Sequence, residues 1–309
     1  MNQIAGEKCG IGIAEEISRL KKEKNAVLLA HNYQRAGVQD LADFIGDSLE
    51  LAKKAAATDA DVIIFCGVRF MAETAKILSP EKTVFLPRED AGCPMANMIT
   101  AEQLMALKEK HPDARVVSYV NTNADVKAET DVCCTSANAI QVLKNIEADK
   151  IIFVPDQNLA SYCQRFVDKE IIAWEGYCYV HTRMVLEEVL KAKEKLPDAL
   201  FIAHPECTPD VIDQADEVLS TSGMLRFAAR SDRKTFLIGT EEGLIRRLSR
   251  ENPGKTFYAA GTAKICINMK RTDVDDVYQA LEKGRYEIIL PEDIMRRARK
   301  SLDLMLKYI

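Results

Sequence analysis

Short apolar runs alternate along the chain with segments of helical periodicity. The apolar runs are rich in β-branched residues, and we expect strands at 27–30, 62–65, 83–86, 115–120, 151–154, 171–173, 200–203, 235–238 and 256–259. Amphipathic segments such as 41–56 and 137–146 lie between them and predict helices. Continuous apolar strands that alternate with helices are typical of parallel α/β units.

Equivalent landmarks recur at nearly constant intervals. The polar residues that end the first strands are separated by 88 and 85 residues; they are His31, Tyr119 and His204. The cysteines that follow the third expected strand of each repeat are separated by 85 and 88 residues; they are Cys93, Cys178 and Cys266. This spacing favours a triplicated α/β repeat of roughly 86 residues. A single large doubly wound sheet is the alternative.

The repeats define three expected domains. The first covers 1–104, including an N-terminal helix within 1–24, and is completed by C-terminal helices in 270–309. The second covers 105–186 and the third 187–269. No Gly/Ser-rich or Pro-rich linker separates them, so we expect them to pack tightly.

Composition narrows the class of protein. The chain of 309 residues is 47% hydrophobic and 29% charged, which excludes a disordered or collagen-like protein. Its net charge of −5 and the lack of a basic run argue against nucleic-acid binding. The N-terminal sequence has no secretory pattern and no stretch reaches the roughly 20 apolar residues of a membrane span. We therefore expect a cytoplasmic protein with no membrane partner.

Cysteine usage points to a metal. In a reducing compartment the nine cysteines are expected to be thiols or metal ligands. Three thiolates delivered by three repeats suit either a zinc ion with an open position or an iron–sulfur cluster with one iron that lacks a cysteine. The alternative is that these cysteines pack in the core, as we expect for Cys66.

Other polar residues are expected to gather at the same strand ends. Three of the four histidines, His31, His181 and His204, occupy strand-end or cysteine-loop positions. Ser48, Ser136 and Thr221 lie where helices are expected to begin. Hydroxyls there either cap the helix or help its N-terminus bind an anion.

Several stretches match a known family. They are LAHNYQ (29–34), VNTNADVKAE (120–129), CTSANA (134–139), VPDQNLA (154–160), HPEC (204–207), STSGM (220–224) and CINMK (266–270). On these motifs, which extend from the first repeat to the last, the chain resembles the A-type quinolinate synthases of bacterial and archaeal NAD biosynthesis. Some members carry a CxxCxxC motif near the C-terminus, whereas no cysteine follows Cys266 here, so a redox switch at that motif is not expected.

The resemblance implies a fold, a cofactor and a reaction. The fold would be three pseudo-threefold-related three-layer α/β/α domains with parallel sheets around a central cluster. One 4Fe–4S cluster per chain would be held by Cys93, Cys178 and Cys266. The position of His181, three residues after Cys178, separately places it beside this site. The enzyme would condense iminoaspartate with dihydroxyacetone phosphate to give quinolinate, phosphate and water. An L-aspartate oxidase that supplies iminoaspartate would be a functional partner.

The resemblance also implies site residues. The substrate-contacting set would be His31, Tyr33, Ser48, Tyr119, Asn121, Ser136, His204, Glu206 and Thr221. Among these, acid/base chemistry near neutral pH favours Glu206 and the His31/Tyr33 pair as catalytic groups. Two alternatives remain at this point. One is another trilobed three-cysteine 4Fe–4S enzyme of the diphosphate reductase type, and the other is a non-catalytic iron–sulfur sensor.

Overall fold

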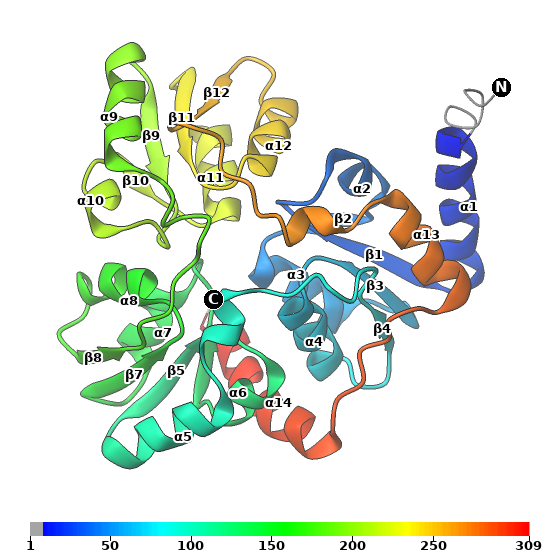
Figure 1. Ribbon diagram of the computed structural model, residues 1–309, viewed down its shortest axis with the longest axis horizontal. Helices are drawn as coiled ribbons and strands as arrows, with labels where there is room; N and C mark the ends of the chain where they lie inside the picture. The colour runs from blue at the N-terminus through cyan, green and yellow to red at the C-terminus, as the bar shows by residue number, and fades with distance from the viewer. Residues whose placement is uncertain (1–8, 309) are drawn as a thin grey trace. The chain divides into compact units, whose positions relative to one another are not determined.

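The protein is an α/β structure in which strands and helices alternate throughout residues 9–308, the part of the chain that this computed structural model describes (Figure 1). Side chains are described from residue 12 onward, so Cys9 and the segment 1–8 of the expected N-terminal helix lie outside the described side chains. Within residues 9–308 no helix combines the length and the apolar character needed to span a membrane.

The strands form three separate four-stranded sheets, all parallel, with one strand order. The first sheet has the order β2-β1-β3-β4, with β1 Ala26–His31, β2 Phe44–Gly46, β3 Val62–Cys66 and β4 Thr83–Phe85. The second has the order β6-β5-β7-β8, with β5 Arg115–Tyr119, β6 Val132–Cys134, β7 Lys150–Val154 and β8 Glu170–Ala173. The third has the order β10-β9-β11-β12, with β9 Leu200–Ala203, β10 Glu217–Val218, β11 Thr235–Gly239 and β12 Thr256–Ala259.

Helices connect and flank these strands. They are α1 Cys9–Glu23, α2 Ala36–Leu41, α3 Ser48–Ala57, α4 Arg69–Leu78, α5 Ala101–Lys110, α6 Ala124–Ala128, α7 Ala139–Asn145, α8 Gln157–Gln164, α9 Leu186–Lys195, α10 Pro209–Ile212, α11 Thr221–Arg230, α12 Gly243–Glu251, α13 Val274–Lys283 and α14 Glu292–Lys307, with 3₁₀ turns at η1 Met95–Met98 and η2 Met269–Arg271. The predicted α/β class with parallel sheets is confirmed, and the single-sheet alternative is wrong.

Strand register places the repeated landmarks at equivalent positions. Ala30 pairs with Cys66, Ser118 with Val154 and Ala203 with Gly239. The residues that directly follow Ala30, Ser118 and Ala203 therefore occupy equivalent positions in the three sheets. They are His31, Tyr119 and His204. This is the alignment that the spacing of the sequence predicts.

Three short strands interrupt segments that the sequence predicts as helix or loop. β2 divides the expected helix 41–56, so that α2 ends at Leu41 and α3 begins at Ser48. The expectation of one helix there is wrong, because Asp43 turns the chain into the sheet by accepting the Leu28 N–H at 2.8 Å. β6 and β10 are the equivalent edge strands of the other sheets.

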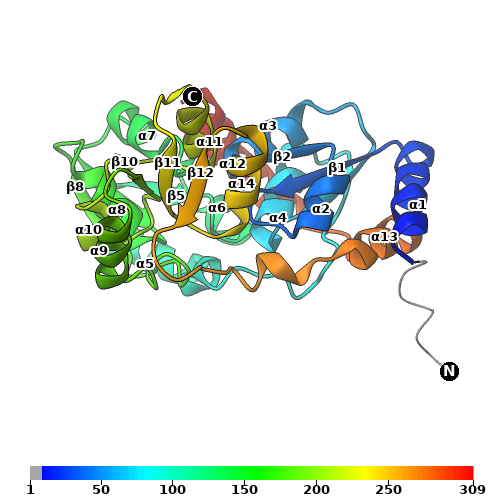
Figure 2. The ribbon, with the colours of Figure 1, turned by 90° about the horizontal axis from the view of Figure 1, so that it is seen from above.

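The chain divides into two compact units. The first contains the residues up to Gly92 together with Ile267–Leu290, and the second contains Cys93–Cys266 together with Pro291–Ile309. In the first unit α13 lies beside α1, as both views show (Figures 1 and 2). We expected 270–309 to complete the first domain, whereas α14 packs on α6 and β6 of the second unit. Ala298, Leu302 and Met305 of α14 are fully buried there, which explains its position.

Each sheet has its own apolar core. Leu28 and Ile64 pack with Val277 of α13 in the first unit. In the second unit Val116 and Ile152 belong to one cluster, and Phe201 and Leu237 to another. The central strands are mainly apolar on both faces because helices cover them, and most polar residues lie toward the strand ends.

Candidate active site and metal centre

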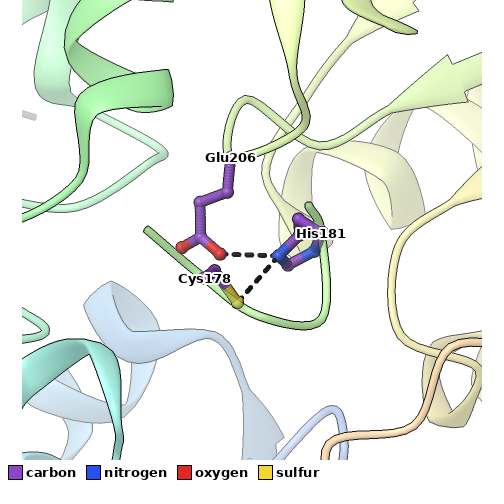
Figure 3. Close-up of side chains that lie close together, drawn as sticks. All are labelled: Cys178, His181 and Glu206. Atoms are coloured by element: carbon purple, nitrogen blue, oxygen red, sulfur yellow. Dashed lines mark hydrogen bonds and ion pairs between the residues drawn. The ribbon is translucent and has the colours of Figure 1, made fainter. Parts of the chain in front are cut away.

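Glu206 is the centre of a buried polar cluster in the second unit. Tyr119, at the end of β5, donates its hydroxyl to Glu206 Oε1 at 2.5 Å. His181 Nδ1 lies 2.6 Å from Glu206 Oε2, and the two side chains come from the loops that follow β8 and β9 (Figure 3). Burial disfavours the charged carboxylate, but His181 and His204 together with these hydrogen bonds lower the pKa of Glu206 below its ordinary value. The cluster therefore holds a charged base next to two imidazoles.

Backbone hydrogen bonds fix the tautomers of two histidines. The N–H of Glu206 donates to His204 Nδ1 at 3.3 Å, and the N–H of Tyr33 donates to His31 Nδ1 at 3.2 Å. Because Nδ1 accepts in both rings, the proton of each neutral imidazole is on Nε2. His181 stacks on His204 with ring centroids 4.5 Å apart, and its Nε2 lies 2.8 Å from Thr240 Oγ1.

The three cysteines of the repeat differ from the other cysteines. Among the eight whose side chains are described, Cys93, Cys178 and Cys266 are half-buried, and the rest are buried. The buried ones are Cys66, Cys133, Cys134, Cys163 and Cys207. The three half-buried cysteines all belong to the second compact unit. The sequence distinguished the same three by their register alone.

Electrostatic interactions join these thiols to one another. Burial, with a contribution from the nearby Cys266, raises the pKa of Cys93 to about 12. Burial also raises the pKa of Cys178, with Glu206 and Cys93 contributing. Thiols that disfavour one another's ionisation become thiolates only when a cation compensates their charge, so the donor set fits a metal or a metal cluster.

His181 joins the cysteine loop to the carboxylate. Its Nδ1 lies 3.2 Å from Cys178 Sγ and also faces Glu206 (Figure 3). One ligand atom from each of Cys178, His181 and Glu206 lies within 4.8 Å of the others. His181 therefore contacts Cys178, and its role beside a cluster ligand stays a prediction.

Hydroxyl-bearing residues occupy equivalent positions in the three sheets. Ser48, Ser136 and Thr221 each follow an edge strand, two residues after the position opposite His31, Tyr119 or His204. The capping acceptors are the preceding residues Asp47 for α3 and Ser220 for α11. Capping is therefore done by neighbours, which removes the main structural alternative for Ser48 and Thr221.

Two further predicted residues line the same strand ends of the second unit. Ser136 interacts with the Tyr119 hydroxyl and opposes the rise in its pKa that burial and Glu206 cause. Asn121 Oδ1 is buried and has no hydrogen-bond partner among the described residues. An orphaned acceptor of this kind suits a ligand that donates a hydrogen bond.

His31, Tyr33 and Ser48 belong to the first compact unit. The rings of His31 and Tyr33 contact each other edge to face with centroids 4.6 Å apart. Lys270 donates to the Tyr33 carbonyl at 2.6 Å, so the segment after Cys266 supports this pair. Their convergence with the residues of the second unit stays a prediction.

Reasoning from the sequence missed two buried carboxylates, Asp156 and Glu241, both fully buried. Burial raises the pKa of Asp156, and the neighbouring Glu206 raises it further. The signal that could have found them is the register of the repeats, because Asp156 lies two residues after β7 and Glu241 two residues after the equivalent strand β11.

Comparison with known proteins identifies the family. Residues 15–307 match the family model described as quinolinate synthetase A protein. The chain is 54% identical to the quinolinate synthase of Methanoregula boonei over 95% of its length and 97% of that protein. It is 53% identical to that of Thermodesulfovibrio yellowstonii, over 96% and 98%, and 52% identical to that of Alkaliphilus metalliredigens, over 95% and 97%. With its three parallel sheets and polar strand ends the protein is an α/β enzyme. It belongs to the quinolinate synthase family.

Proposed function

We propose that the protein condenses iminoaspartate with dihydroxyacetone phosphate to form quinolinate, phosphate and two molecules of water. It would act in NAD biosynthesis as a transferase that forms a carbon–carbon bond with loss of phosphate. The reaction changes no net oxidation state, so it consumes no external electrons. The observation that carries the proposal is the group of half-buried cysteines, Cys93, Cys178 and Cys266, beside the charged Glu206.

The cofactor proposed for this site is one 4Fe–4S cluster per chain, held by Cys93, Cys178 and Cys266. The residues fit such a group because the three thiols interact with one another and are less buried than the other described cysteines. When bound, the cluster supplies a Lewis-acidic iron at the corner that has no cysteine. His181 would orient the Cys178 ligand through its contact with the sulfur.

The protein's own groups would bind the substrates and move protons. Glu206, which is charged and within reach of two proton carriers, is the proposed base. The His31/Tyr33 pair, with its tautomer fixed, is the second proposed proton carrier. Tyr119, Asn121 and His204 would contact the substrate, and the hydroxyls of Ser48, Ser136 and Thr221 would bind its carboxylates or phosphate.

An anaerobic assay tests the proposal. Protein purified without oxygen is supplied with dihydroxyacetone phosphate and with iminoaspartate generated by an L-aspartate oxidase, and quinolinate is measured. Formation of quinolinate supports the proposal. Formation of none by protein that carries a full cluster would contradict it, and would favour a reductase or a sensor.

The cysteine ligands are tested by three single substitutions. Cys93→Ala, Cys178→Ala and Cys266→Ala are each expected to abolish both the stable cluster and quinolinate formation, because three ligands are needed to hold four irons. Cys66→Ala and Cys163→Ala are matched controls, since both thiols are buried in the apolar core. Iron and sulfide content and the visible spectrum are the measurements. A full iron content in any of the first three variants would overturn the ligand assignment.

A further inference from the structure

A backbone clamp is repeated in all three sheets beside each cysteine of the repeat. Two residues beyond β3, β7 and β11 the chain turns, and the next N–H donates to the carbonyl of the residue two positions before the cysteine. The three bonds are Arg69 N–H to Ala91 O at 2.8 Å, Gln157 N–H to Gly176 O at 2.9 Å and Glu242 N–H to Lys264 O at 3.0 Å. The start of each cysteine loop is thus tied to the end of a central strand.

In the third sheet a carboxylate extends this clamp to the cysteine itself. Glu241 Oε1 accepts the backbone N–H of Cys266 at 3.1 Å, and Oε2 accepts the N–H of Gly243 at 2.7 Å. The backbone of Glu241 also forms an isolated parallel β-bridge with that of Lys264, and Glu241 is fully buried. Both oxygens of one buried carboxylate therefore hold backbone groups, one of them on the cysteine.

Asp156 is the equivalent residue of the second sheet. Its Oδ1 accepts the N–H groups of Asn158 and Leu159, both at 2.8 Å. The backbone of Asp156 forms an isolated parallel β-bridge with that of Gly176. The other oxygen, Oδ2, is buried and has no hydrogen-bond partner among the described residues, and the backbone amide of Cys178 is near enough to favour the charged form of the carboxylate. Gly176 has no room for a side chain, because a Cβ there would lie 2.3 Å from the Pro155 carbonyl.

The first repeat lacks this carboxylate. Val68 occupies the equivalent position, two residues beyond Cys66. The backbone amides of Met95 and Ala96, where η1 begins, instead lie near the Cys93 thiol and favour its thiolate form. Cys266 is therefore hydrogen-bonded to a buried carboxylate and Cys178 lies near one, whereas the first repeat has no acidic residue at this position.

We propose that Asp156 and Glu241 are positioning residues that fix the backbones of the cluster ligands Cys178 and Cys266. This inference rests on the proposed function, because it assumes that these cysteines hold a cluster. Groups that orient metal ligands without touching the metal commonly change metal affinity or activity by roughly 10- to 100-fold when they are replaced. A loop that is less well fixed would release its iron faster.

Glu241→Gln and Asp156→Asn test the proposal in the full-length holoenzyme. An amide has the shape of the carboxylate but only one acceptor oxygen. In the Glu241→Gln variant the single amide oxygen therefore cannot accept from both Cys266 and Gly243. In the Asp156→Asn variant the amide oxygen is needed to cap α8, so the NH₂ group must turn toward Cys178. Asp216→Asn and Asp131→Asn are matched controls. Asp216 accepts the Phe201 N–H and Asp131 the Val116 N–H, both at 2.7 Å and at the far ends of the same sheets.

The measurements are the rate at which a ferrous-iron chelator removes iron, the visible and electron paramagnetic resonance spectra, and the unfolding temperature. We expect each test variant to lose iron roughly 10-fold faster than its control at a comparable unfolding temperature, with an altered cluster spectrum. Iron loss at the rate of the controls would overturn the inference. So would failure of both test variants to fold while the controls fold, because the carboxylates would then serve the fold as a whole. A parent protein that takes up no iron–sulfur cluster would refute the proposed function instead.

Discussion

At the scale of single residues, the site depends on buried polar groups placed at strand ends. Glu206 is 3% exposed, yet Tyr119 and His181 each contact one of its oxygens. A buried carboxylate costs stability unless it is paired, so these contacts are what make a charged base possible here. The sequence supplied the identity of these residues through motifs and spacing. It did not supply the pairing, because Tyr119 and Glu206 are 87 positions apart.

Glu206→Gln separates the base from its hydrogen bonds. Glutamine fills the same space and keeps one acceptor, so the fold and the cysteine site are expected to persist while the base is lost. We expect turnover to fall by roughly 10²- to 10⁴-fold, the usual contribution of a general base. Glu217→Gln, on the half-buried edge strand β10 of the same sheet, is the control. Steady-state assay of quinolinate, with iron content measured in parallel, decides the result; near-normal turnover would make Glu206 a structural residue.

At the scale of elements, the nine expected strands are all present, and the three that were missed form one class. β2, β6 and β10 contain only two or three residues each, too few for a periodic pattern to appear. Each follows an aspartate whose side chain accepts an N–H of the neighbouring central strand; the aspartates are Asp43, Asp131 and Asp216. The signal that could have predicted them is an aspartate directly before each short strand, repeated in register at 43, 131 and 216.

The end of α13 shows how a single residue terminates an element. Gly284 follows Lys283 with φ of 63°, a left-handed conformation, and its N–H donates to Ala280 O at 3.0 Å. A Cβ there would meet Phe85 only at an ordinary 3.5 Å, so the demand for glycine is conformational and not steric.

Gly284→Ala is therefore expected to lower the free energy of unfolding by about 1 kcal/mol, the cost of a left-handed backbone for an L-residue. Gly254→Ala is the control, because a methyl group there meets nothing within 4 Å. It is expected to be neutral or slightly stabilising, since alanine restricts the unfolded chain. Urea unfolding monitored by circular dichroism measures both, and equal stabilities would contradict the assignment of strain to Gly284.

At the scale of the whole molecule, the chain does not complete one compact unit before it begins the next. It leaves the second unit at Cys266, contributes Ile267–Leu290 to the first, and returns at Pro291. The amphipathic pattern of 274–309 predicted helices but not their destinations. Both α13 and α14 have an apolar face. Which unit each helix packs on depends on which apolar surface of the folded chain is left uncovered by other elements. Only the tertiary structure contains that information.

Polar contacts give α14 a specific place on the second unit. Ser301 donates to the Lys127 carbonyl at 3.0 Å, and Asn138 donates to the carbonyls of Met305 and Tyr308, both at 3.1 Å. Asn138 also accepts the Thr135 N–H at 2.8 Å, in the segment that contains Ser136. The C-terminal helix is thereby connected to a predicted substrate-binding segment.

Leu302→Ala tests whether α14 stabilises the second unit in particular. Leu302 is fully buried, so we expect the free energy of unfolding to fall by roughly 2–5 kcal/mol through lost burial and the cavity that remains. Leu190→Ala, on the solvent side of α9 at 45% exposure, is the control and is expected to change stability by less than about 0.5 kcal/mol.

In hydrogen–deuterium exchange, peptides from α6 and β6 of the Leu302→Ala variant should exchange faster, because those elements contact α14. Peptides from β1 and β3 should exchange at the parental rate. Faster exchange confined to β1 and β3 would instead assign the helix to the first unit, as the sequence alone suggested.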